Sequence, residues 1–594
     1  MSKISPAGYR FPEPFSGVQV NFCKNIKCKA FGVPETLHRV RRPKGTSPKA
    51  GDYIRTGDSR GNVRIQCGLC GSQNPLRSNE SIAQELGRLS AHIFDTREPC
   101  CPNEACGNHN VAVTTTGQYV RNGKTASGTP RWRCNACKKT FAGTAAPQAR
   151  QRKPHKNRDV FALLVNKMAL NRIMEVTGLS STSVYGKIGL IHRQCMTFAG
   201  QREQQLVQGM PLPSMYVAVD RQVHYVNWSN RKDRRNVALS AIGSADLVSG
   251  YVFGFNLNFD PELNPSFVEA EAATNGDLLE YEAYRKFARV WLSTDYQAAI
   301  EASKVRKSPA KKFKTAAFEE GLEQDITAHY EQAQAREDIE TENADSDTTL
   351  PGNGVQIKDQ YTMHGHFHLL ATLLQNADKV RFYMDQDSGM RAAFLGAFAE
   401  RVKQRTADAW FVSVMKDATV TQKEVAVNRA KARLLEATAA YPGSGPEEVK
   451  LILMKEEMAR PKEMGGFGDV WLSHPVPNMS EPAKKVAWLT DFGDYDEDHQ
   501  ARLYLKASLH AIDRFFMQAR RRLSLAERSI TTASSERRTW YGYSAYNPEN
   551  LANTLEIFRV FYNYCKEGKD KQTPAMRLGL AKAPISLEDI LYFK

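Results

Sequence analysis

Apolar and polar positions in residues 160–195 follow the pattern of helix, turn and helix. The apolar positions at helical spacing are Phe161, Leu164, Val165, Met168, Ile173, Val176, Val184 and Ile188. Gly178 suits the tight turn, and Ser180 or Ser181 can cap the helix that follows. This pattern is typical of a helix-turn-helix, whose second helix enters the major groove of DNA. A plain helical hairpin has the same pattern and stays open as an alternative.

The apolar runs after residue 210 predict a mixed α/β body. Three successive strands are expected in MYVAVDRQV (215–223), RRNVALSAIGS (234–244) and VSGYVFGFNLN (248–258). A helix at 361–377, a strand at 379–384 and a strand at 409–415 follow. The runs 262–302 and 421–520 are mainly helical in pattern. Between them, residues 315–349 hold 11 acidic residues and one basic residue, which predicts a solvated insertion or flexible loop.

Charge is distributed unevenly along the 594 residues, whose formal net charge is +16. Residues 1–200 contain 31 basic and 11 acidic residues, so their net charge is +20, and the other 394 residues sum to −4. A basic front on a near-neutral body suggests a module that binds a polyanion. The sequence has no run of about 20 apolar residues, so no membrane span is expected. The start, MSKISPAGYRF, lacks the apolar segment of a signal peptide, which favours a cytoplasmic protein or, in a nucleated cell, a nuclear one.

Nine of the 11 cysteines precede residue 140, and eight of them form a repeated pattern. Each repeat is C-x4-C followed by C-x2-C: first Cys23, Cys28, Cys67 and Cys70, then Cys101, Cys106, Cys134 and Cys137. Four thiolates on two knuckles can surround one Zn²⁺ ion tetrahedrally. We therefore expect two structural zinc sites in ribbon-like modules. Cys101 is favoured over Cys100 because CPNEAC repeats the gap of CKNIKC.

Acidic residues stand at the ends of predicted strands in the body. Asp220 lies near the end of the first strand, Asp385 directly follows the fourth strand, and a glutamate lies on a late helix. Carboxylates placed in this way converge at one edge of a sheet and can hold two Mg²⁺ or Mn²⁺ ions about 3.5–4 Å apart. This arrangement favours a metal-dependent phosphoryl-transfer site.

Several segments carry a resemblance to a known family. They are GTPRWRCNACKKTF, FYMDQDSGMRAAF and RVFYNYCKEGKDKQTPAMRLGLA. Together with the order of elements, they resemble DDE transposases of the bacterial insertion-sequence type, with a retroviral-integrase-like (RNase H-like) catalytic core. The resemblance covers about residues 95–195 and 210–585 and leaves the first cysteine module unmatched.

The resemblance implies particular residues for the active site. Asp220, Asp385 and Glu527 would be the catalytic, magnesium-binding carboxylates, with Asp385 favoured over Asp387 and Glu527 over Glu536. DNA-binding residues are expected in the basic segment and on the second helix of the helix-turn-helix. They are Arg152, Lys153, Lys156, Arg158, Ser183, Tyr185 and Lys187.

The expected fold class is a multidomain α+β protein. The predicted units are a first zinc module (1–95), a second zinc ribbon (96–147), a basic linker with a helix-turn-helix (148–200), the first part of an RNase H-like core (210–420, with an acidic insertion at about 304–355), a helical insertion (421–505) and the final core helices with the C-terminal tail (506–594). The resemblance implies a nucleoid-associated bacterial transposase that binds duplex DNA at transposon ends and in the target as a homo-oligomer. A zinc-ribbon regulator that binds DNA without catalysis is the alternative, and a structure-specific nuclease with the same core is another.

Overall fold

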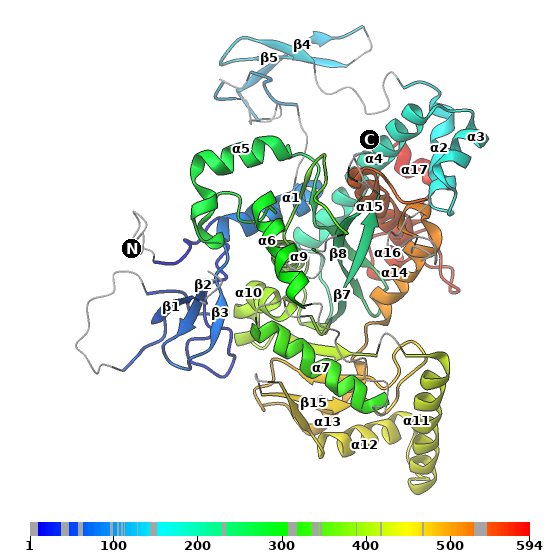
Figure 1. The fold of residues 1–594 in the computed structure, drawn as a ribbon. Coiled ribbons are helices and arrows are strands. Elements are labelled where there is room, and N and C mark those ends of the chain that lie inside the picture. The colour runs from blue at the N-terminus through cyan, green and yellow to red at the C-terminus, as the bar shows by residue number, and fades with distance from the viewer. Residues whose placement is uncertain are drawn as a thin grey trace.

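A central mixed sheet flanked by helices forms the body of the computed structural model, and two small three-stranded sheets lie outside it (Figure 1). The structure describes residues 10–36, 47–57, 63–94, 99–103, 106–108, 111, 113, 115–126, 129–142, 151–227, 233, 235–306, 318–335, 344, 347–387, 389–415, 418–465, 468–527 and 543–593. These ranges cover the strands predicted for the body except Arg234.

Eight strands make up the central sheet. In sheet order they are β14 (Lys462–Met464), β15 (Asp469–Ser473), β16 (Lys485–Trp488), β13 (Ala407–Ser413), β12 (Val380–Asp385), β7 (Met215–Val226), β8 (Val237–Asp246) and β9 (Val252–Leu257). The antiparallel meander β7–β8–β9 agrees with the sequence pattern, and β12 and β13 join β7 in parallel. All residues of β8, β9 and β13 are buried, because helices cover both faces of the sheet.

Helices pack closely on both faces of the sheet. They include α1 (Asn79–Phe94), α4 (Ser181–Val207), α9 (Asp359–Leu373), α10 (Met390–Lys403), α14 (His510–Arg522) and α15 (Pro548–Tyr564). A Cβ added to Gly243 in β8 would lie 2.7 Å from side-chain atoms of Ile512 and Phe516 in α14. A Cβ added to Gly254 in β9 would lie 3.0 Å from the ring of His366 in α9. Each glycine therefore allows a helix to approach one face of the sheet.

The segment predicted as a helical insertion at 421–505 contains strands as well as helices. Its helices are α11 (Val420–Ala440), α12 (Pro446–Met458) and α13 (Glu497–Lys506). Strands β14, β15 and β16 extend the central sheet, and β16 pairs antiparallel with β13 through Trp488 and Trp410. The segment is mainly helical, as the pattern indicates, but its three strands were not predicted. The reason is that a buried run as short as KVAW has no periodicity that separates a strand from a helix.

The first half of the acidic tract (315–349) forms a helix, although the sequence predicted a solvated insertion or flexible loop. Helix α7 (Phe318–Ala335) occupies it, and its buried residues Leu322, Ile326 and Tyr330 recur every four positions. The Tyr330 hydroxyl donates to Asp469 at the start of β15 and accepts from Trp471 Nε1 at 3.2 Å. This apolar stripe was hidden in the sequence by the many acidic residues on the other faces of the helix. Residues 336–343 lie outside the described part of the chain.

Two small three-stranded sheets belong to the N-terminal cysteine modules. The first consists of β1 (Tyr53–Gly57), β2 (Val63–Cys67) and β3 (Gln73–Pro75), and the second of β4 (Tyr119–Lys124), β5 (Pro130–Cys134) and β6 (Thr140–Ala142). The first module lies against the body: Arg77 forms an ion pair of 3.2 Å with Glu282, and α1 follows directly after β3. In the second module, the described hydrogen bonds of residues 99–142 stay within that range.

The helix-turn-helix region forms three helices: α2 (Asn157–Leu164), α3 (Leu170–Thr177) and α4. Gly178 ends α3 in the left-handed conformation with φ of 64°, and the Ser180 side chain caps α4 by accepting from the Ser183 N–H. Both features agree with the sequence pattern. Beyond the motif, α4 continues to Val207 and packs against α1 and α15. The second helix of the motif is therefore rigidly continuous with the body.

The remaining elements of the described chain complete the outer layer of the molecule. They are α5 (Pro265–Asn275), α6 (Ser293–Arg306), α16 (Pro574–Leu578), α17 (Leu587–Leu591), and the short strands β10 (Phe259–Asp260) and β11 (Val355–Gln356). None of the helices in the described ranges is both long enough and apolar enough to cross a membrane.

The outer edge of β9 is closed by side chains instead of another strand. Asn563 in α15 accepts from the Val252 N–H and donates to the Val252 carbonyl, both at 2.9 Å. Arg88 in α1 donates to the carbonyl of Leu257 at 3.0 Å. These contacts occupy backbone groups that could otherwise pair with a foreign strand. They also give a structural role to Asn563, which lies in the segment RVFYNYCKEGKDKQTPAMRLGLA.

A buried charge cluster fastens the N-terminal and C-terminal helices to each other. Glu203 in α4 accepts from Arg559 in α15 at 2.7 Å and from the Tyr251 hydroxyl at 2.8 Å, and it pairs with His92 in α1 at 2.8 Å. Burial raises the pKa of Glu203, but Arg559 and His92 outweigh it and lower this pKa to about 2. The carboxylate therefore favours folding fully above pH 4.5, its ordinary pKa, and that contribution disappears as the pH falls toward 2.

Replacing Glu203 with glutamine is expected to destabilise the body strongly, because Arg559 would keep a buried charge without its main partner. The expected loss of unfolding free energy is about 3–5 kcal/mol, measured by urea denaturation at pH 7. Glu175→Gln is the matched control, since Glu175 pairs with Arg172 on the exposed surface of α3. Equal midpoints for both variants would contradict a structural role for the cluster.

Candidate functional site

The three carboxylates predicted as catalytic line a single large cavity. Asp220, Asp385 and Glu527 share a cavity of about 1040 Å³ bounded by β7, α14 and the segment after α14. Residues of the insertion, among them Lys423 and Ser480, form another part of its wall. Positions separated by hundreds of residues in sequence therefore face the same space.

Strand pairing explains why Asp220 and Asp385 are neighbours. β7 and β12 run parallel, with Val219 opposite Met384, so the next residues along both strands are Asp220 and Asp385. Adjacent strands are about 4.8 Å apart, which brings the two backbones close at this level of the sheet. The buried apolar residues that precede the pair on both strands fix this register.

Asp385 and Asp387 have different surroundings, although they are almost adjacent in sequence. Asp387 accepts from Arg221 Nε at 2.8 Å, and Arg221 also pairs with Asp359 at 2.5 Å. Asp387 therefore belongs to a half-buried ion-pair network, whereas Asp385 lines the cavity. The preference for Asp385 over Asp387 as the catalytic residue stays a prediction.

Glu527 is contacted by the helix-turn-helix. It follows the short 3-10 helix η4 (Ser524–Ala526), and its carboxylate pairs with Lys167 Nζ at 2.9 Å. Lys167 lies between α2 and α3, and its backbone N–H donates to the Arg522 carbonyl at 2.6 Å. Asn166 accepts from the Arg522 guanidinium at 3.0 Å. The motif is thus docked on the segment that carries Glu527. The rival Glu536 lies outside the described residues.

Two further side chains of the cavity were missed in the sequence. Asp513, on α14, lines the cavity together with the three predicted carboxylates. It was hidden within an amphipathic helix whose buried residues Ile512 and Phe516 cover the sheet. His224 on β7 also lines the cavity, and burial, with Arg520 nearby, lowers its pKa to about 3. Its imidazole is therefore neutral at pH 7. The sequence did contain a signal for His224: it lies four residues after Asp220 on the same strand, so both side chains lie on the same face of the sheet.

The carboxylates share a cavity without being gathered around one point. In the described ranges, only the two cysteine sets form groups of three or more ligand atoms within 4.8 Å of one another. Oxygen donors of this kind suit a hard divalent cation such as Mg²⁺.

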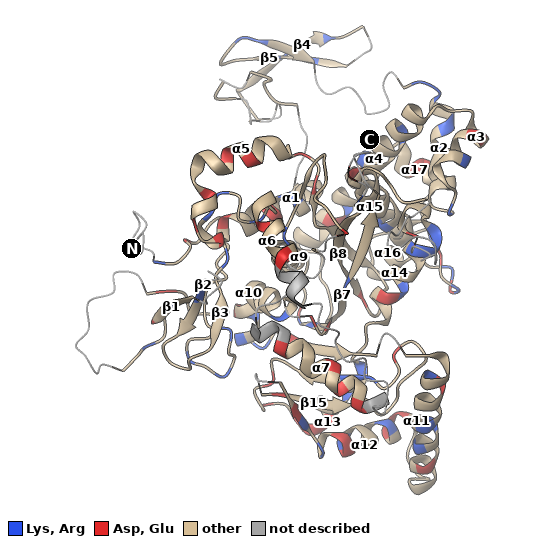
Figure 2. Cartoon of the chain, viewed as in Figure 1, with Lys and Arg blue, Asp and Glu red and all other residues tan. Residues whose placement is uncertain are grey.

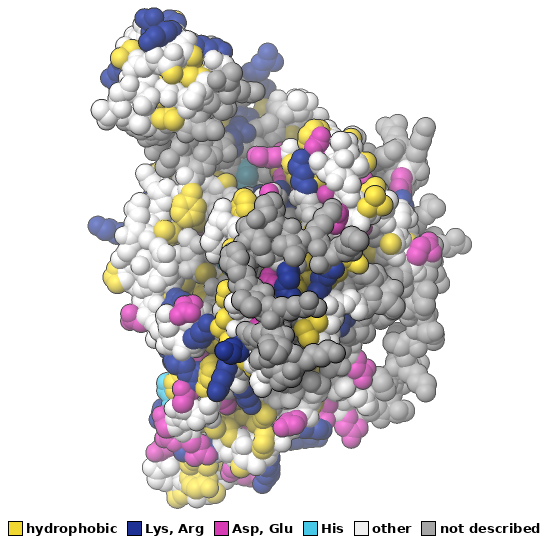
Figure 3. All heavy atoms as spheres, turned by 90° about the vertical axis from the view of Figure 1, so that its left-hand side faces the viewer, with side chains coloured by type: hydrophobic (Ala, Val, Ile, Leu, Met, Phe, Trp, Pro, Cys, Tyr) yellow, Lys and Arg dark blue, Asp and Glu magenta, His cyan; other side chains and the backbone are white. Residues whose placement is uncertain are grey.

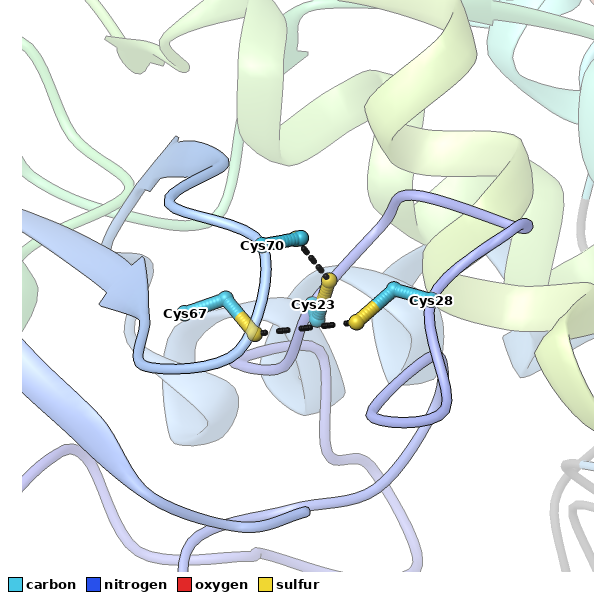
Figure 4. Close-up of side chains that lie close together, drawn as sticks. All are labelled: Cys23, Cys28, Cys67 and Cys70. Carbon is cyan, nitrogen blue, oxygen red and sulfur yellow. Dashed lines mark hydrogen bonds between the residues drawn. The ribbon is translucent and has the colours of Figure 1, made fainter. Parts of the chain in front are cut away.

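Each cysteine set is arranged to hold one metal ion. In the first module, Cys23 and Cys70 have their sulfur atoms 3.6 Å apart, and Cys28 and Cys67 3.9 Å apart, with all four side chains pointing together (Figure 4). In the second module, the Cys101–Cys137 and Cys106–Cys134 distances are 3.4 and 3.7 Å. A zinc ion with Zn–S bonds of about 2.3 Å requires sulfur atoms about 3.8 Å apart. Both sets could therefore bind zinc, and Cys101, as predicted, is the member of the second set.

The two modules repeat more than their cysteines. Tyr53 pairs in register with Cys67, and its hydroxyl accepts from the Cys23 N–H at 3.0 Å. Tyr119 pairs in the same way with Cys134, and its hydroxyl accepts from the Cys101 N–H at 3.0 Å. A tyrosine 14 or 15 residues before the third cysteine was a sequence signal that went unused.

Within the second cluster, the surroundings favour the thiolate form of Cys134, whereas burial raises the pKa of Cys101. Burial raises the pKa of Cys134, but backbone N–H groups of Cys137 and Ala136 outweigh it, and the pKa falls to about 6. The thiolate is the form that binds zinc.

The predicted DNA-binding residues separate into exposed and engaged side chains. Arg152, Lys153 and Tyr185 are exposed, and Ser183 is half-buried beside Ser180. Arg158 is exposed but pairs with Glu588, and Lys156 is half-buried and pairs with Asp159 at 3.5 Å. Figure 2 shows lysine and arginine positions along the helices α2–α4, in contrast to the acidic positions along α7.

The assignment of Lys187 to the DNA-facing surface is wrong. Its side chain is buried, and Nζ donates to Asn157 Oδ1 at 2.5 Å and to the Lys153 carbonyl at 3.0 Å. These acceptors satisfy the hydrogen-bonding capacity of an ammonium group that the helical pattern predicted to face outward. Lys187 therefore fixes α2 against α4.

Comparison with known proteins identified no relative from which a function could be inferred. No protein-family model matches the chain, and no curated protein matches its sequence. Any functional assignment therefore depends on the residues and contacts described above.

Proposed function

We propose that this chain is a DNA transposase of the DDE type, which binds the ends of a mobile element and carries out metal-dependent 3′-end cleavage and strand transfer. The observation that carries the proposal is the shared cavity: Asp220 and Asp385 adjoin on parallel strands, and Glu527 faces the same space. The strand order β9–β8–β7–β12–β13, antiparallel and then parallel, supports an RNase H-like core.

In this proposal, the carboxylates of Asp220, Asp385 and Glu527 hold Mg²⁺ or Mn²⁺. Such ions would activate a water or a 3′-hydroxyl and stabilise the leaving oxygen at phosphorus. The chain's own side chains position the substrate, with Arg514, Arg520 and Lys423 lining the cavity as partners for phosphate oxygens. A covalent link between protein and DNA is not required.

DNA recognition is assigned to the N-terminal units. Residues 105–158 contain no acidic residue and 11 lysines and arginines. Among the basic residues are Arg121, Arg131, Arg133, Lys156 and Arg158. The second zinc module stands away from the body, with lysine and arginine side chains on its surface (Figure 3). Two DNA ends have to be cut together, so a homo-oligomer on DNA is part of the proposal.

A cleavage and joining assay tests the proposal directly. Full-length protein, Mg²⁺ and a labelled duplex carrying the inverted repeat from the flanks of the gene are expected to give a 3′-hydroxyl nick at the repeat end, followed by joined products. EDTA is expected to abolish both products. Cleavage without preference for the repeat and without joining would instead identify a nuclease.

A DNA-binding regulator without catalysis is the second candidate. It is favoured by one observation: the carboxylates of the described cavity are not gathered around a common point, and Glu527 is paired with Lys167. Sequence-specific binding with no Mg²⁺-dependent product on any repeat-bearing duplex would establish this alternative.

Replacing Lys167 with methionine is expected to increase the cleavage rate, because Glu527 would lose the cation that holds it toward the helix-turn-helix. An exposed ion pair contributes about 0.2–1 kcal/mol, so the increase should be up to about fivefold. Initial rates at saturating DNA measure it. Arg172→Met is the control, since Arg172 pairs with Glu175 in the same motif. A slower rate for Lys167→Met alone would show instead that Lys167 supports Glu527.

A further inference from the structure

A second, smaller pocket adjoins the cavity of the carboxylates. It has a volume of about 170 Å³ and lies where the turn between β8 and β9, the start of α14 and the segment after α15 meet. His510 and Arg514 line both this pocket and the large cavity, so the two spaces are separated by a single turn of α14. Lys566, Glu567 and Arg577 complete the charged part of its wall.

Positive charge accumulates in this pocket. Burial lowers the pKa of Lys566, and the neighbouring cations Arg522 and Arg514 lower it further. Arg514 and Lys566 have no ion pair within the described residues, and Glu567 is the only carboxylate among the described lining side chains. Cations held together in this way leave an attraction for an anion unsatisfied.

Arg577 makes one wall of the pocket rigid. Its guanidinium binds both oxygens of Asp570, at 2.6 and 2.9 Å, and donates to the Ser249 carbonyl at 3.2 Å. The contact with Ser249 ties the C-terminal segment to the β8–β9 turn. The Lys566 ammonium lies 5.9 Å from the centroid of the Tyr562 ring, which also lines the pocket.

We propose that this pocket binds a phosphate of the DNA backbone close to the phosphate that is cut, with Arg514 and Lys566 as its main ligands. The inference rests on the proposed function for the identity of the strand, but the phosphate-binding chemistry follows from the pocket itself. Phosphates along one strand repeat about every 3.4 Å of helix axis. A strand in the carboxylate cavity can therefore present a neighbouring phosphate across Arg514, which would fix the register of cleavage.

Salt-dependent DNA binding tests the pocket apart from catalysis. Full-length Asp220→Asn protein, with and without Lys566→Gln, is titrated with a fluorescent repeat-bearing duplex at several salt concentrations. Loss of one phosphate contact is expected to reduce the slope of log K against log salt by about 0.9. Lys569→Gln is the matched control, because Lys569 is an exposed lysine of the same segment outside the pocket. Equal reductions for both lysine variants, or none for Lys566→Gln, would overturn the proposal.

DNA with one uncharged methylphosphonate linkage tests which backbone phosphate the pocket binds. A single methylphosphonate next to the cut position is expected to weaken binding of the protein with Lys566 and to have no further effect on Lys566→Gln. Inorganic phosphate is titrated as the second probe. Binding of inorganic phosphate without any effect of the methylphosphonate would assign the pocket to a free anion and refute the DNA contact. Because these readouts involve no cleavage, a failed cleavage assay leaves their outcome unaffected, and melting temperatures verify that each variant is folded.

Discussion

Replacing Asp220 or Asp385 with asparagine is expected to reduce Mg²⁺-dependent cleavage by a factor on the order of 10³, because each change removes a charged ligand worth several kcal/mol in the transition state. Binding of the DNA end should persist, since both residues face the cavity and not the helix-turn-helix. Gel assays of cleavage and anisotropy measurements of binding, made on the same preparations, separate the two effects.

Two other aspartates make the test specific. Asp378→Asn is the matched control: Asp378 is an exposed residue just before β12, near the opposite end of the strand from Asp385. It should leave cleavage unchanged. Asp387→Asn should lower the melting temperature more than it affects cleavage, because Asp387 pairs with the half-buried Arg221. Wild-type cleavage by both Asp220→Asn and Asp385→Asn would refute the catalytic assignment.

Loss of zinc is the second large effect, and we expect it to differ between the two modules. Zinc contributes about 10–16 kcal/mol to the folding of small cysteine modules, so a module without zinc should unfold. Cys134→Ser should reduce zinc from two ions per chain to one and weaken DNA binding, while the melting temperature of the body stays the same. Metal analysis, calorimetry and DNA titration measure these outcomes.

Cys67→Ser should also remove one zinc ion, but with a wider consequence. The first module is joined to the body through the Arg77–Glu282 ion pair and continues directly into α1, where His92 contacts Glu203. Its unfolding should therefore lower the melting temperature of the body. Equal melting temperatures for Cys67→Ser and Cys134→Ser would contradict this division between the modules. Zinc content of zero in the wild type would contradict both sites.

The sequence by itself determined the features that depend on local spacing. The C-x4-C and C-x2-C gaps identified both ligand sets, because a knuckle needs its cysteines a few residues apart. Gly178 and Ser180 marked the turn and cap of the helix-turn-helix, since both act within one turn of their own backbone. The apolar runs after residue 210 predicted β7 to β9, β12 and β13 in the right order.

Only the tertiary structure decided which side chains meet across the fold. Lys187 turned inward because Asn157 and a backbone carbonyl accept its protons, which helical periodicity does not encode. Asp513 joined the cavity through the packing of α14 on β7, and Lys167 reached Glu527 across 360 positions of sequence. The strands β14–β16 and the helix α7 formed because nearby surfaces buried their short apolar runs. Burial and long-range pairing depend on partners distant in the chain, so local pattern cannot determine them.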